Sequence, residues 1–269
     1  MYLEVNGRRV FATTGGKAFD NEKPVVLFLS GSALDHTFWG LHSRFFAFRN
    51  YAVLVPDTPG HSNSEGPLLE TIEELGDWVQ ALVTALDAKN ISVVGHSQGC
   101  LTALEFVSRY PDEVRSLSLI GSGYATPVNP NLIAAAENDP DAAVDMMISW
   151  GFGAAGHFHQ GPIPGNSMAV GGWRIMRGNA PDALATDLKA CNAYQAGSAA
   201  AAKIQCPHQV ILGGKDRMTP RKAGMKLVEA LPDPEFHLIE ESGHMIPLEA
   251  PNRCRSLLRD FVFANNPAS

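Results

Sequence analysis

The stretch Ile91-Ser92-Val93-Val94-Gly95-His96-Ser97-Gln98-Gly99, followed by helical periodicity from Cys100 to Arg109, decides the fold. The first four residues are typical of a strand buried on both faces of a sheet. A serine in the tight turn from such a strand into a helix projects its hydroxyl above the sheet edge, and the flanking glycines leave room for the turn. The helix that follows directs its free amides at this serine, where they favour developing negative charge. We therefore predict a nucleophile elbow with Ser97 at its tip.

A serine hydroxyl is a weak nucleophile, so an elbow serine requires an acid and a histidine further along the chain. Asp216 and His244 occur in that order, each in a loop that follows a predicted strand. We predict that Ser97, Asp216 and His244 are the catalytic residues. Asp57 also follows a strand, but it precedes the elbow and is interpreted as a carboxylate that braces its loop.

The rest of the chain alternates strands with helices. Short segments at Leu3 to Val5 and Arg9 to Thr13 flank Asn6-Gly7, which is a strong hairpin signal. Buried strands are predicted at Val25 to Leu29, Ala52 to Val55, Ile91 to Val94, Leu117 to Ile120, Gln209 to Leu212 and Glu235 to Ile239. Helical periodicity covers residues 37–48, 71–88, 99–109, 221–230 and 251–264. This alternation predicts an α/β fold with a mostly parallel sheet, helices on both faces, and ligands bound beyond the carboxyl ends of the strands.

One interval breaks this rhythm. Between Gly121 and Cys206 we find alanine-rich helical patches and loops rich in glycine and proline, without a clear buried strand. A chain of 269 residues suits one core with a sizeable insertion. We predict a core domain of residues 1–121 and 206–269, and a helical cap or lid domain of residues 122–205.

Composition excludes several classes of protein. The formal charge is −7, and no basic run exceeds Arg8-Arg9, which disfavours a nucleic-acid surface. The chain has 45% hydrophobic and 18% charged residues, it begins without a signal-like segment, and it has no apolar run long enough to cross a bilayer. The cysteines show no C-x-x-C spacing, which favours reduced thiols: Cys100, Cys191, Cys206 and Cys254. We expect a cytoplasmic protein without nucleic-acid or membrane partners.

The other histidines have structural interpretations. His96 lies inside the elbow and is expected to support the turn, whereas His36 and His61 lie in loops near the same edge and could line the pocket. His157 and His159 have a spacing compatible with metal ligands, but no third ligand is evident, and catalytic zinc sites take three. We predict neither a metal nor an organic cofactor.

Several motifs together resemble those of the α/β-hydrolase superfamily, over essentially the whole chain. They are Gly95-His96-Ser97-Gln98-Gly99, Pro56-Asp57-Thr58-Pro59-Gly60-His61-Ser62, Gly213-Gly214-Lys215-Asp216 and Gly243-His244-Met245. The resemblance implies a triad of Ser97, His244 and Asp216, a sheet of about eight strands, and a cap domain formed by the insertion.

The oxyanion loop departs from many relatives, which carry a His-Gly pair after the third strand. Here the sequence is Leu29-Ser30-Gly31-Ser32-Ala33-Leu34. Because an oxyanion hole uses backbone N–H groups, loss of that histidine need not remove the hole. By position, we assign the N–H groups of Ser32 and Gln98, with Ala33 as the alternative to Ser32.

A serine at the elbow indicates acyl transfer to water, whereas an aspartate would have indicated dehalogenase or epoxide-hydrolase chemistry. We predict a carboxylic ester hydrolase acting on a small-molecule ester. The alternatives in the same superfamily are carbon-carbon bond hydrolases, lactonases, amidases and perhydrolases, although the usual loop of the carbon-carbon hydrolases is absent. A receptor on this fold is a further alternative, since function lies in sites and not in folds.

The insertion supplies an apolar, adaptable set of side chains for a hydrophobic substrate. The candidate substrate-binding residues are Met147, Trp150, Phe152, Met168 and Trp173. At least half of the insertion's large apolar residues are expected to form its own core instead. The glycines between Gly151 and Gly165 suggest a mobile stretch, and hence a lid.

Overall fold

A computed structural model describes residues 1–157 and 167–268. It contains an eight-stranded sheet in the order β1-β2-β4-β3-β5-β6-β7-β8, in which β2 pairs antiparallel with β1 and β4, and the other neighbours are parallel. The strands are β1 Tyr2–Val5, β2 Arg8–Thr13, β3 Val25–Leu29, β4 Ala52–Pro56, β5 Ile91–His96, β6 Val114–Ile120, β7 His208–Gly213 and β8 Glu235–Ile239. The predicted fold class is confirmed, and the strands differ from the predicted ones only at their ends.

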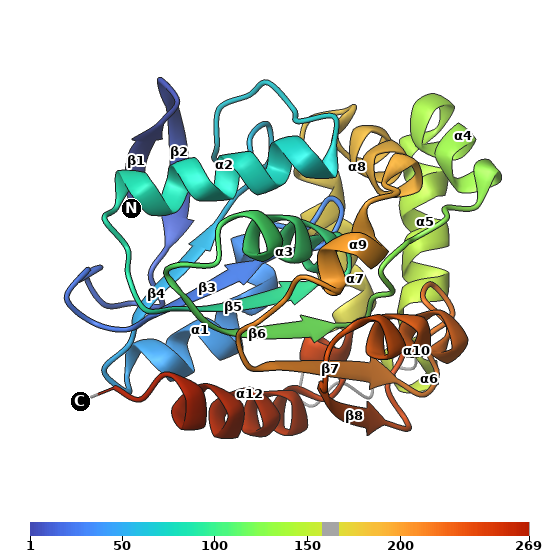
Figure 1. Cartoon of the computed structure of the whole chain (residues 1–269). Coiled ribbons are helices and arrows are strands. Elements are labelled where there is room, and N and C mark those ends of the chain that lie inside the picture. The colour runs from blue at the N-terminus through green and yellow to red at the C-terminus, as the bar shows by residue number, and fades with distance from the viewer. Residues whose placement is uncertain (158–166, 269) are drawn as a thin grey trace.

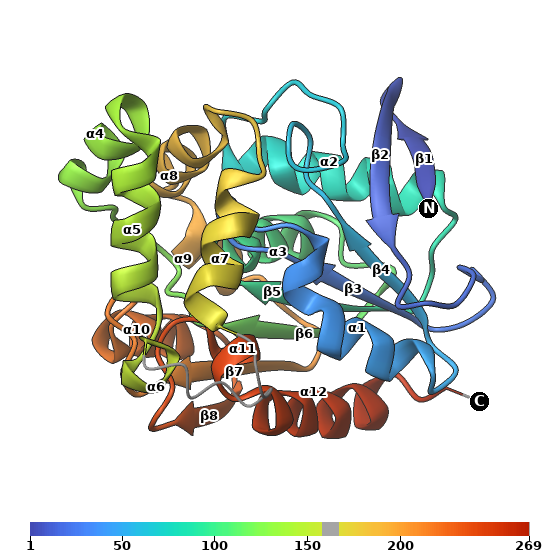
Figure 2. The ribbon, with the colours of Figure 1, turned by 180° about the vertical axis from the view of Figure 1, so that it is seen from behind.

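Helices cover both faces of the sheet. Alternate residues of each central strand point to opposite sides, so the apolar side chains on both sides need a covering layer. Val26 and Phe28 of β3 belong to one buried cluster, and Leu27 and Leu29 belong to another. The first face is covered by α1 (Gly40–Ala47) and α12 (Pro251–Asn265). The second is covered by α2 (Ile72–Ala85), α3 (Gln98–Arg109) and α10 (Arg221–Ala230). Figures 1 and 2 show these two layers from opposite sides.

The helix predicted over residues 37–48 is divided. A 3₁₀ turn, η1 (His36–Trp39), comes first, and its N-terminal amide is capped by the Asp35 carboxylate through Thr37 N–H. The α-helix α1 starts at Gly40. Aspartate is a strong helix cap because its side chain accepts a free N–H of the first turn, so this cap fixes the start of the helical region.

The interval between β6 and β7 is helical in its described part. It contains α4 (Pro130–Asn138), α5 (Pro140–Gly151), α6 (Ala154–His157), α7 (Met168–Arg177), α8 (Ala183–Ala193) and α9 (Gly197–Ala201). Helices α4, α5, α7 and α8 gather at the end of the sheet toward which β5 and β6 point (Figure 1). This is the edge where parallel sheets carry their ligands. His159, named above for a metal, and Gly165, named for a lid, lie outside the described residues.

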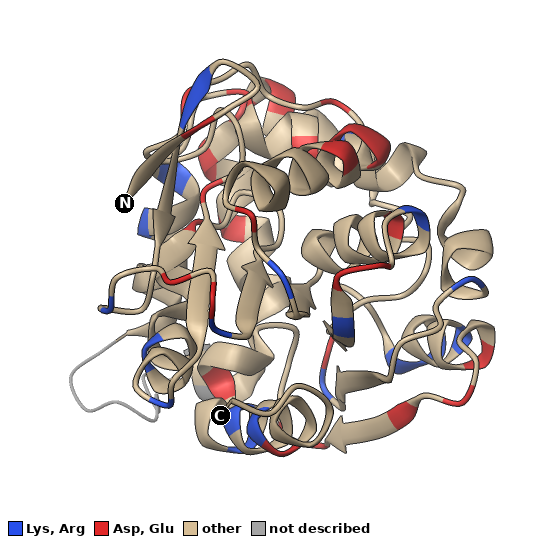
Figure 3. Cartoon of the chain, turned by 60° about the vertical axis from the view of Figure 1, so that its left-hand side comes forward, with Lys and Arg blue, Asp and Glu red and all other residues tan. Residues whose placement is uncertain are grey.

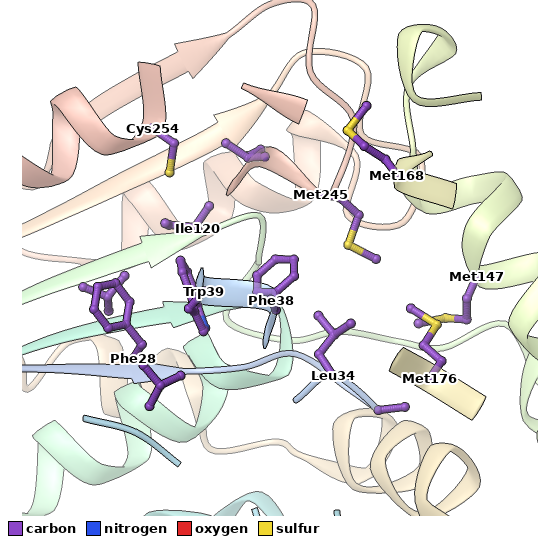
Figure 4. Close-up of a cluster of buried hydrophobic side chains, with 14 of the residues drawn as sticks. Phe28, Leu34, Phe38, Trp39, Ile120, Met147, Met168, Met176, Met245 and Cys254 are labelled. Atoms are coloured by element: carbon purple, nitrogen blue, oxygen red, sulfur yellow. The ribbon is translucent and has the colours of Figure 1, made fainter. Parts of the chain in front are cut away.

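The core and the inserted helices share one apolar cluster. It runs from Phe28 of β3 and Trp39 of η1 to Met147, Met168 and Met176 of α5 and α7 (Figure 4). Burial of apolar side chains is the main favourable term in folding. The inserted helices are therefore held to the core by packing as well as by polar contacts.

The remaining global features concern charge, membranes and metals. Acidic and basic residues are interspersed along the ribbon in Figure 3. In the described ranges, no helix is both long and apolar enough to cross a bilayer. Within the same ranges, no group of three His, Cys, Asp or Glu side chains is arranged to hold a metal ion.

Candidate active site

The elbow places Ser97 between the end of β5 and the start of α3. Its backbone angles are φ 54° and ψ −119°, a left-handed conformation that non-glycine residues rarely adopt. Such a residue costs on the order of 1–3 kcal/mol and persists only when its surroundings over-determine it. Ser97 N–H donates to the Ile120 carbonyl at 3.0 Å, and the following helix holds the other side of the turn.

The two glycines of the elbow are required by close backbone contacts. A Cβ on Gly95 would lie 2.4 Å from the Gly99 carbonyl oxygen, and one on Gly99 would lie 2.3 Å from the Leu29 carbonyl oxygen. Neither backbone oxygen can move without displacing a strand or helix. The sharp turn that presents Ser97 therefore requires glycine at both positions.

Asp216 and His244 meet although 28 residues separate them. His244 Nδ1–H donates to Asp216 Oδ2 at 2.8 Å, and both side chains are buried. Asp216 Oδ1 accepts the N–H groups of Met218 and Thr219, each at 2.8 Å. The carboxylate is held on both oxygens, and it leaves the Nε2 atom of the imidazole for chemistry.

His96 supports the histidine loop from inside the elbow. Its Nε2–H donates to the backbone carbonyl of His244 at 3.0 Å. Burial, together with the neighbouring His244, lowers the pKa of His96 to about 3, so this ring is neutral. A neutral imidazole can donate through one nitrogen without placing a charge beside Asp216 and His244.

Ser97 and His244 line the same cavity of about 270 Å³. The Ser97 hydroxyl makes no hydrogen bond within the described residues. Both apolar and polar side chains line the cavity, and the insertion contributes most of the apolar ones. Its lining comprises Ser32, Ser97, Thr126, Pro127, Val128, Asn129, Leu132, Met147, Trp150, Leu188, Cys191, Arg217, Met218, Thr219 and His244.

The loop after β3 distinguishes the two candidate oxyanion donors. Ser32 is buried and lines the cavity beside Ser97. The Ala33 N–H instead donates to the Asp187 carboxylate of α8 at 2.7 Å. Because that N–H is already satisfied, the geometry favours Ser32 over Ala33 as the partner of Gln98, whose N–H lies at the N-terminus of α3.

The five candidate substrate-binding residues divide into two groups. Met147 and Trp150 of α5 line the cavity. Phe152 and Met168 are buried in the apolar cluster, and Trp173 is 38% exposed. These three do not line the cavity, because they pack between the inserted helices or face away from the core.

His36 and His61 do not line this cavity. His36 donates from its backbone N–H and its Nδ1 to the buried Asp57, at 2.8 and 2.9 Å, which supports the interpretation of Asp57 as a bracing carboxylate. His61 Nε2 bonds Asp187 Oδ2 at 3.0 Å. Burial opposes charge on His61, but the Asp187 carboxylate, the Pro59 carbonyl and Asp57 together outweigh burial, and the pKa of His61 is raised.

Glu249 ties the histidine loop to the insertion. Its Oε2 accepts Gly153 N–H at 2.8 Å and Gly243 N–H at 3.1 Å, and its Oε1 accepts Met245 N–H at 3.1 Å. Burial raises the pKa of Glu249, while these amides and His244 oppose the shift. A single carboxylate therefore fixes the residues on both sides of His244 and the end of α5.

Glu249→Gln is expected to lower kcat/KM for the ester hydrolysis predicted from the sequence by about tenfold, which is equivalent to about 1.4 kcal/mol of transition-state stabilisation. The donors approach both carboxylate oxygens, so the amide NH₂ of glutamine must face at least one N–H group, which leaves a hydrogen bond unmade. Kinetics of the variant would be compared with Glu229→Gln, an exposed position on α10. A wild-type kcat/KM would mean that Asp216 and the Gly151 carbonyl hold His244 without Glu249.

Sequence reasoning did not predict several residues at the site, and four of them are important for its geometry. Leu132 and Leu188 line the cavity, and Asp187 and Glu249 anchor its loops. The position of Asp187 in the sequence could have identified it as a residue that needs a buried partner. It lies three residues after Leu184 and four before Cys191, on the buried face of α8, where an acid needs a partner.

A model of the alpha/beta hydrolase family matches residues 26–256. Among curated proteins, Protein ABHD8 from Mus musculus is 27% identical over 248 residues, covering 88% of this chain and 55% of the mouse protein. The chain thus spans about half the length of the ABHD8 relatives that it matches.

Two further likenesses cover most of both partners. Pimeloyl-(acyl-carrier protein) methyl ester esterase from Chromobacterium violaceum is 29% identical over 218 residues, covering 77% of this chain and 84% of that protein. The enol-lactonase from Burkholderia xenovorans has a TM-score of 0.87 at 21% identity, covering 97% of this chain and 99% of that one. At that identity, the structural likeness shows the fold alone.

Proposed function

The chain belongs to the alpha/beta hydrolase family, and from that premise we propose that it is a serine hydrolase that cleaves carboxylic esters through an acyl-enzyme intermediate. The observation that carries the proposal is the buried 2.8 Å hydrogen bond from His244 to Asp216, at a cavity that also receives Ser97 from a strained elbow. A packing role would require neither the strain nor the exposure of the serine to a cavity.

In the proposed reaction, the Ser97 hydroxyl attacks the ester carbonyl carbon while His244 Nε2 takes its proton. Asp216 holds the imidazole and stabilises its charged form. The oxyanion of the tetrahedral intermediate lies between the amides of Ser32 and Gln98, and loss of one such donor costs about 2.7–4 kcal/mol. His244 then protonates the leaving alcohol, and water repeats the sequence on the acyl-enzyme.

We further propose that residues 122–205 act as a cap that selects the acyl group. Leu132, Met147, Trp150 and Leu188 supply an apolar wall to the cavity. At about 270 Å³, the volume is just below the usual range for small-molecule sites. Both features suit a small to medium hydrophobic substrate.

A lactone is the second candidate substrate, because it is an internal ester and is opened by the same attack. An enol-lactonase has this same fold, so lactones are tested beside open esters. The two kinds of substrate differ in where the leaving oxygen goes. An open ester releases an alcohol, whereas a lactone keeps the alcohol on the acyl group and needs room for both ends in the cavity.

The function would be tested with p-nitrophenyl esters of increasing acyl length and with five- and six-membered lactones. We expect turnover of esters to be fastest at short to medium chain length. Repeated turnover also separates an enzyme from a ligand receptor, which would bind the ester without releasing product. If no ester or lactone were turned over, carboxylic ester hydrolysis would be rejected for this site.

Trp150→Ala is expected to move the chain-length optimum to acyl groups longer by about two methylene groups. Each methylene group that becomes buried in the enlarged cavity contributes about 0.8 kcal/mol to binding. The reason is that Trp150 lines the cavity, so its removal lengthens the space for the acyl chain. Trp173→Ala is the matched control, because Trp173 is 38% exposed and is not among the lining residues. Equal profiles for the two variants would place the acyl group elsewhere.

A further inference from the structure

Two side chains of the insertion hold the Ala33 peptide at both of its polar ends. Asp187 of α8 accepts Ala33 N–H at 2.7 Å, and Asn179, which lies between α7 and α8, donates Nδ2–H to the Ala33 carbonyl at 2.7 Å. Ala33 has φ 53°, a left-handed conformation that costs an alanine about 1–2 kcal/mol. The strained peptide therefore depends on partners from a different part of the chain.

The same two side chains also hold the loop that follows β4. Asp187 Oδ2 is bonded to His61 Nε2 at 3.0 Å, and Asn179 Oδ1 accepts Ser62 N–H at 2.9 Å. Each side chain thus bridges Ala33 to a second fixed point on the core. The Asp187 carboxylate also raises the pKa of His61, which favours the protonated form of that imidazole.

Helix α8 also contacts Ser32 and Gln98, the two residues proposed to donate to the oxyanion. Cys191 Sγ lies 3.8 Å from Ser32 Oγ, and the Asp187 carbonyl accepts Gln98 Nε2–H at 3.4 Å. Both proposed donor residues, Ser32 and Gln98, are therefore in contact with one helix of the insertion. A register error of one residue in the loop would replace Ser32 by Ala33 as the donor.

We propose that Asn179 and Asp187 are positioning residues that orient the Ser30–Leu34 loop so that Ser32 N–H, and not Ala33 N–H, faces the oxyanion. We call this pair the Ala33 clamp. The inference rests on the proposed serine-hydrolase function and adds a role for the insertion in catalysis itself. Neither residue touches the reacting atoms, and both act through the loop.

Paired variants can distinguish the effect of the Asp187 hydrogen bonds from the effect of the Asp187 charge. Both Asp187 bonds use Oδ2, and Oδ1 has no hydrogen bond within the described residues. Asparagine can therefore present its carbonyl oxygen to both donors, whereas alanine presents none. We expect Asp187→Ala to lower kcat about 10- to 100-fold and Asn179→Ala about tenfold, with KM changed less than about threefold, while Asp187→Asn stays within about fivefold of the wild-type kcat.

A second readout does not depend on ester turnover. In labelling by an alkyl fluorophosphonate, Ser97 Oγ bonds to phosphorus, its proton passes to His244, and fluoride leaves with its electron pair. The phosphoryl oxygen takes the place of the oxyanion, so the labelling rate reports the hole. Asp182→Ala is the control, since Asp182 begins the same helix, is exposed, and makes no side-chain cap hydrogen bond.

Slower labelling and lower kcat per titrated active site in Asp187→Ala and Asn179→Ala, but not in Asp187→Asn or Asp182→Ala, would support the clamp. Wild-type rates in both alanine variants, or an Asp187→Asn variant as slow as Asp187→Ala, would overturn it. If Asp187→Ala did not fold, Asn179→Ala, a half-buried loop position, would decide in the same way.

The two proposals fail in different ways. If the wild type cleaved no ester but was labelled, and labelling slowed in the alanine variants, the clamp would stand and ester hydrolysis would fall. If esters were cleaved and all variants were equal in both assays, ester hydrolysis would stand and the clamp would fall.

Discussion

Ser97→Ala is expected to lower kcat for every ester by roughly 10⁵- to 10⁶-fold, since removing the nucleophile of a triad removes nearly the whole advantage of the unit. Stability should change by no more than about 0.5 kcal/mol. Alanine keeps the same left-handed backbone with the same strain, and the hydroxyl makes no cap hydrogen bond to α3. The variant therefore separates chemistry from folding.

The measurement is kcat with p-nitrophenyl butyrate, together with thermal unfolding. Ser198→Ala, an exposed position on α9, is the matched control and guards against contaminating esterases. More than about 1% residual activity in Ser97→Ala would exceed the expected loss by orders of magnitude. That result would show that Ser97 is not the nucleophile.

Asp216→Asn is the second large effect, with an expected loss in kcat on the order of 10⁴-fold. The Oδ1 position accepts the N–H groups of Met218 and Thr219, so the amide oxygen of asparagine will occupy it and the NH₂ group will face His244. Nδ1 must then accept a hydrogen bond, which leaves the proton on Nε2. An imidazole in that tautomer cannot take a proton from Ser97.

This mechanism predicts that Asp216→Asn is at least as slow as Asp216→Ala, which imposes no tautomer. Nitrogen-15 NMR of the His244 ring would show the proton on Nε2 in the asparagine variant. Asp112→Asn removes a negative charge from an exposed position and serves as the control. A normal rate for Asp216→Asn would mean that another acid orients His244.

Sequence patterns were sufficient for the core because its signals are local. The uninterrupted apolar run from Val25 to Leu29 and the strand-turn-helix at Ser97 each specify an element without reference to distant residues. The predicted triad residues follow strands, and parallel strands end at one edge. The 2.8 Å contact between Asp216 and His244 is a consequence of that edge.

The contacts made by the insertion could not be read in the same way. Met147 and Met168 are chemically equivalent in sequence, yet only Met147 lines the cavity, because the packing of α5 and α7 against each other decides which face each one buries. The bond from Ala33 to Asp187 spans 154 residues, and no local periodicity encodes such a pairing. The helical spacing of Asp187 on the buried face of α8 indicates that its carboxylate needs a hydrogen-bond partner, but it does not indicate which residue that partner is.

The insertion therefore has two parts that differ in how freely they can be redesigned. Residues 130–150 supply Leu132, Met147 and Trp150 to the lining of the cavity, and none of these side chains hydrogen-bonds the Ser30–Leu34 loop in the described ranges. A change of substrate range can be sought there. If the Ala33 clamp acts as proposed, a transplant of the whole insertion between relatives has to carry Asn179 and Asp187 with their core partners Ala33 and His61. Otherwise the recipient would acquire a new pocket above a loop that has lost these hydrogen bonds.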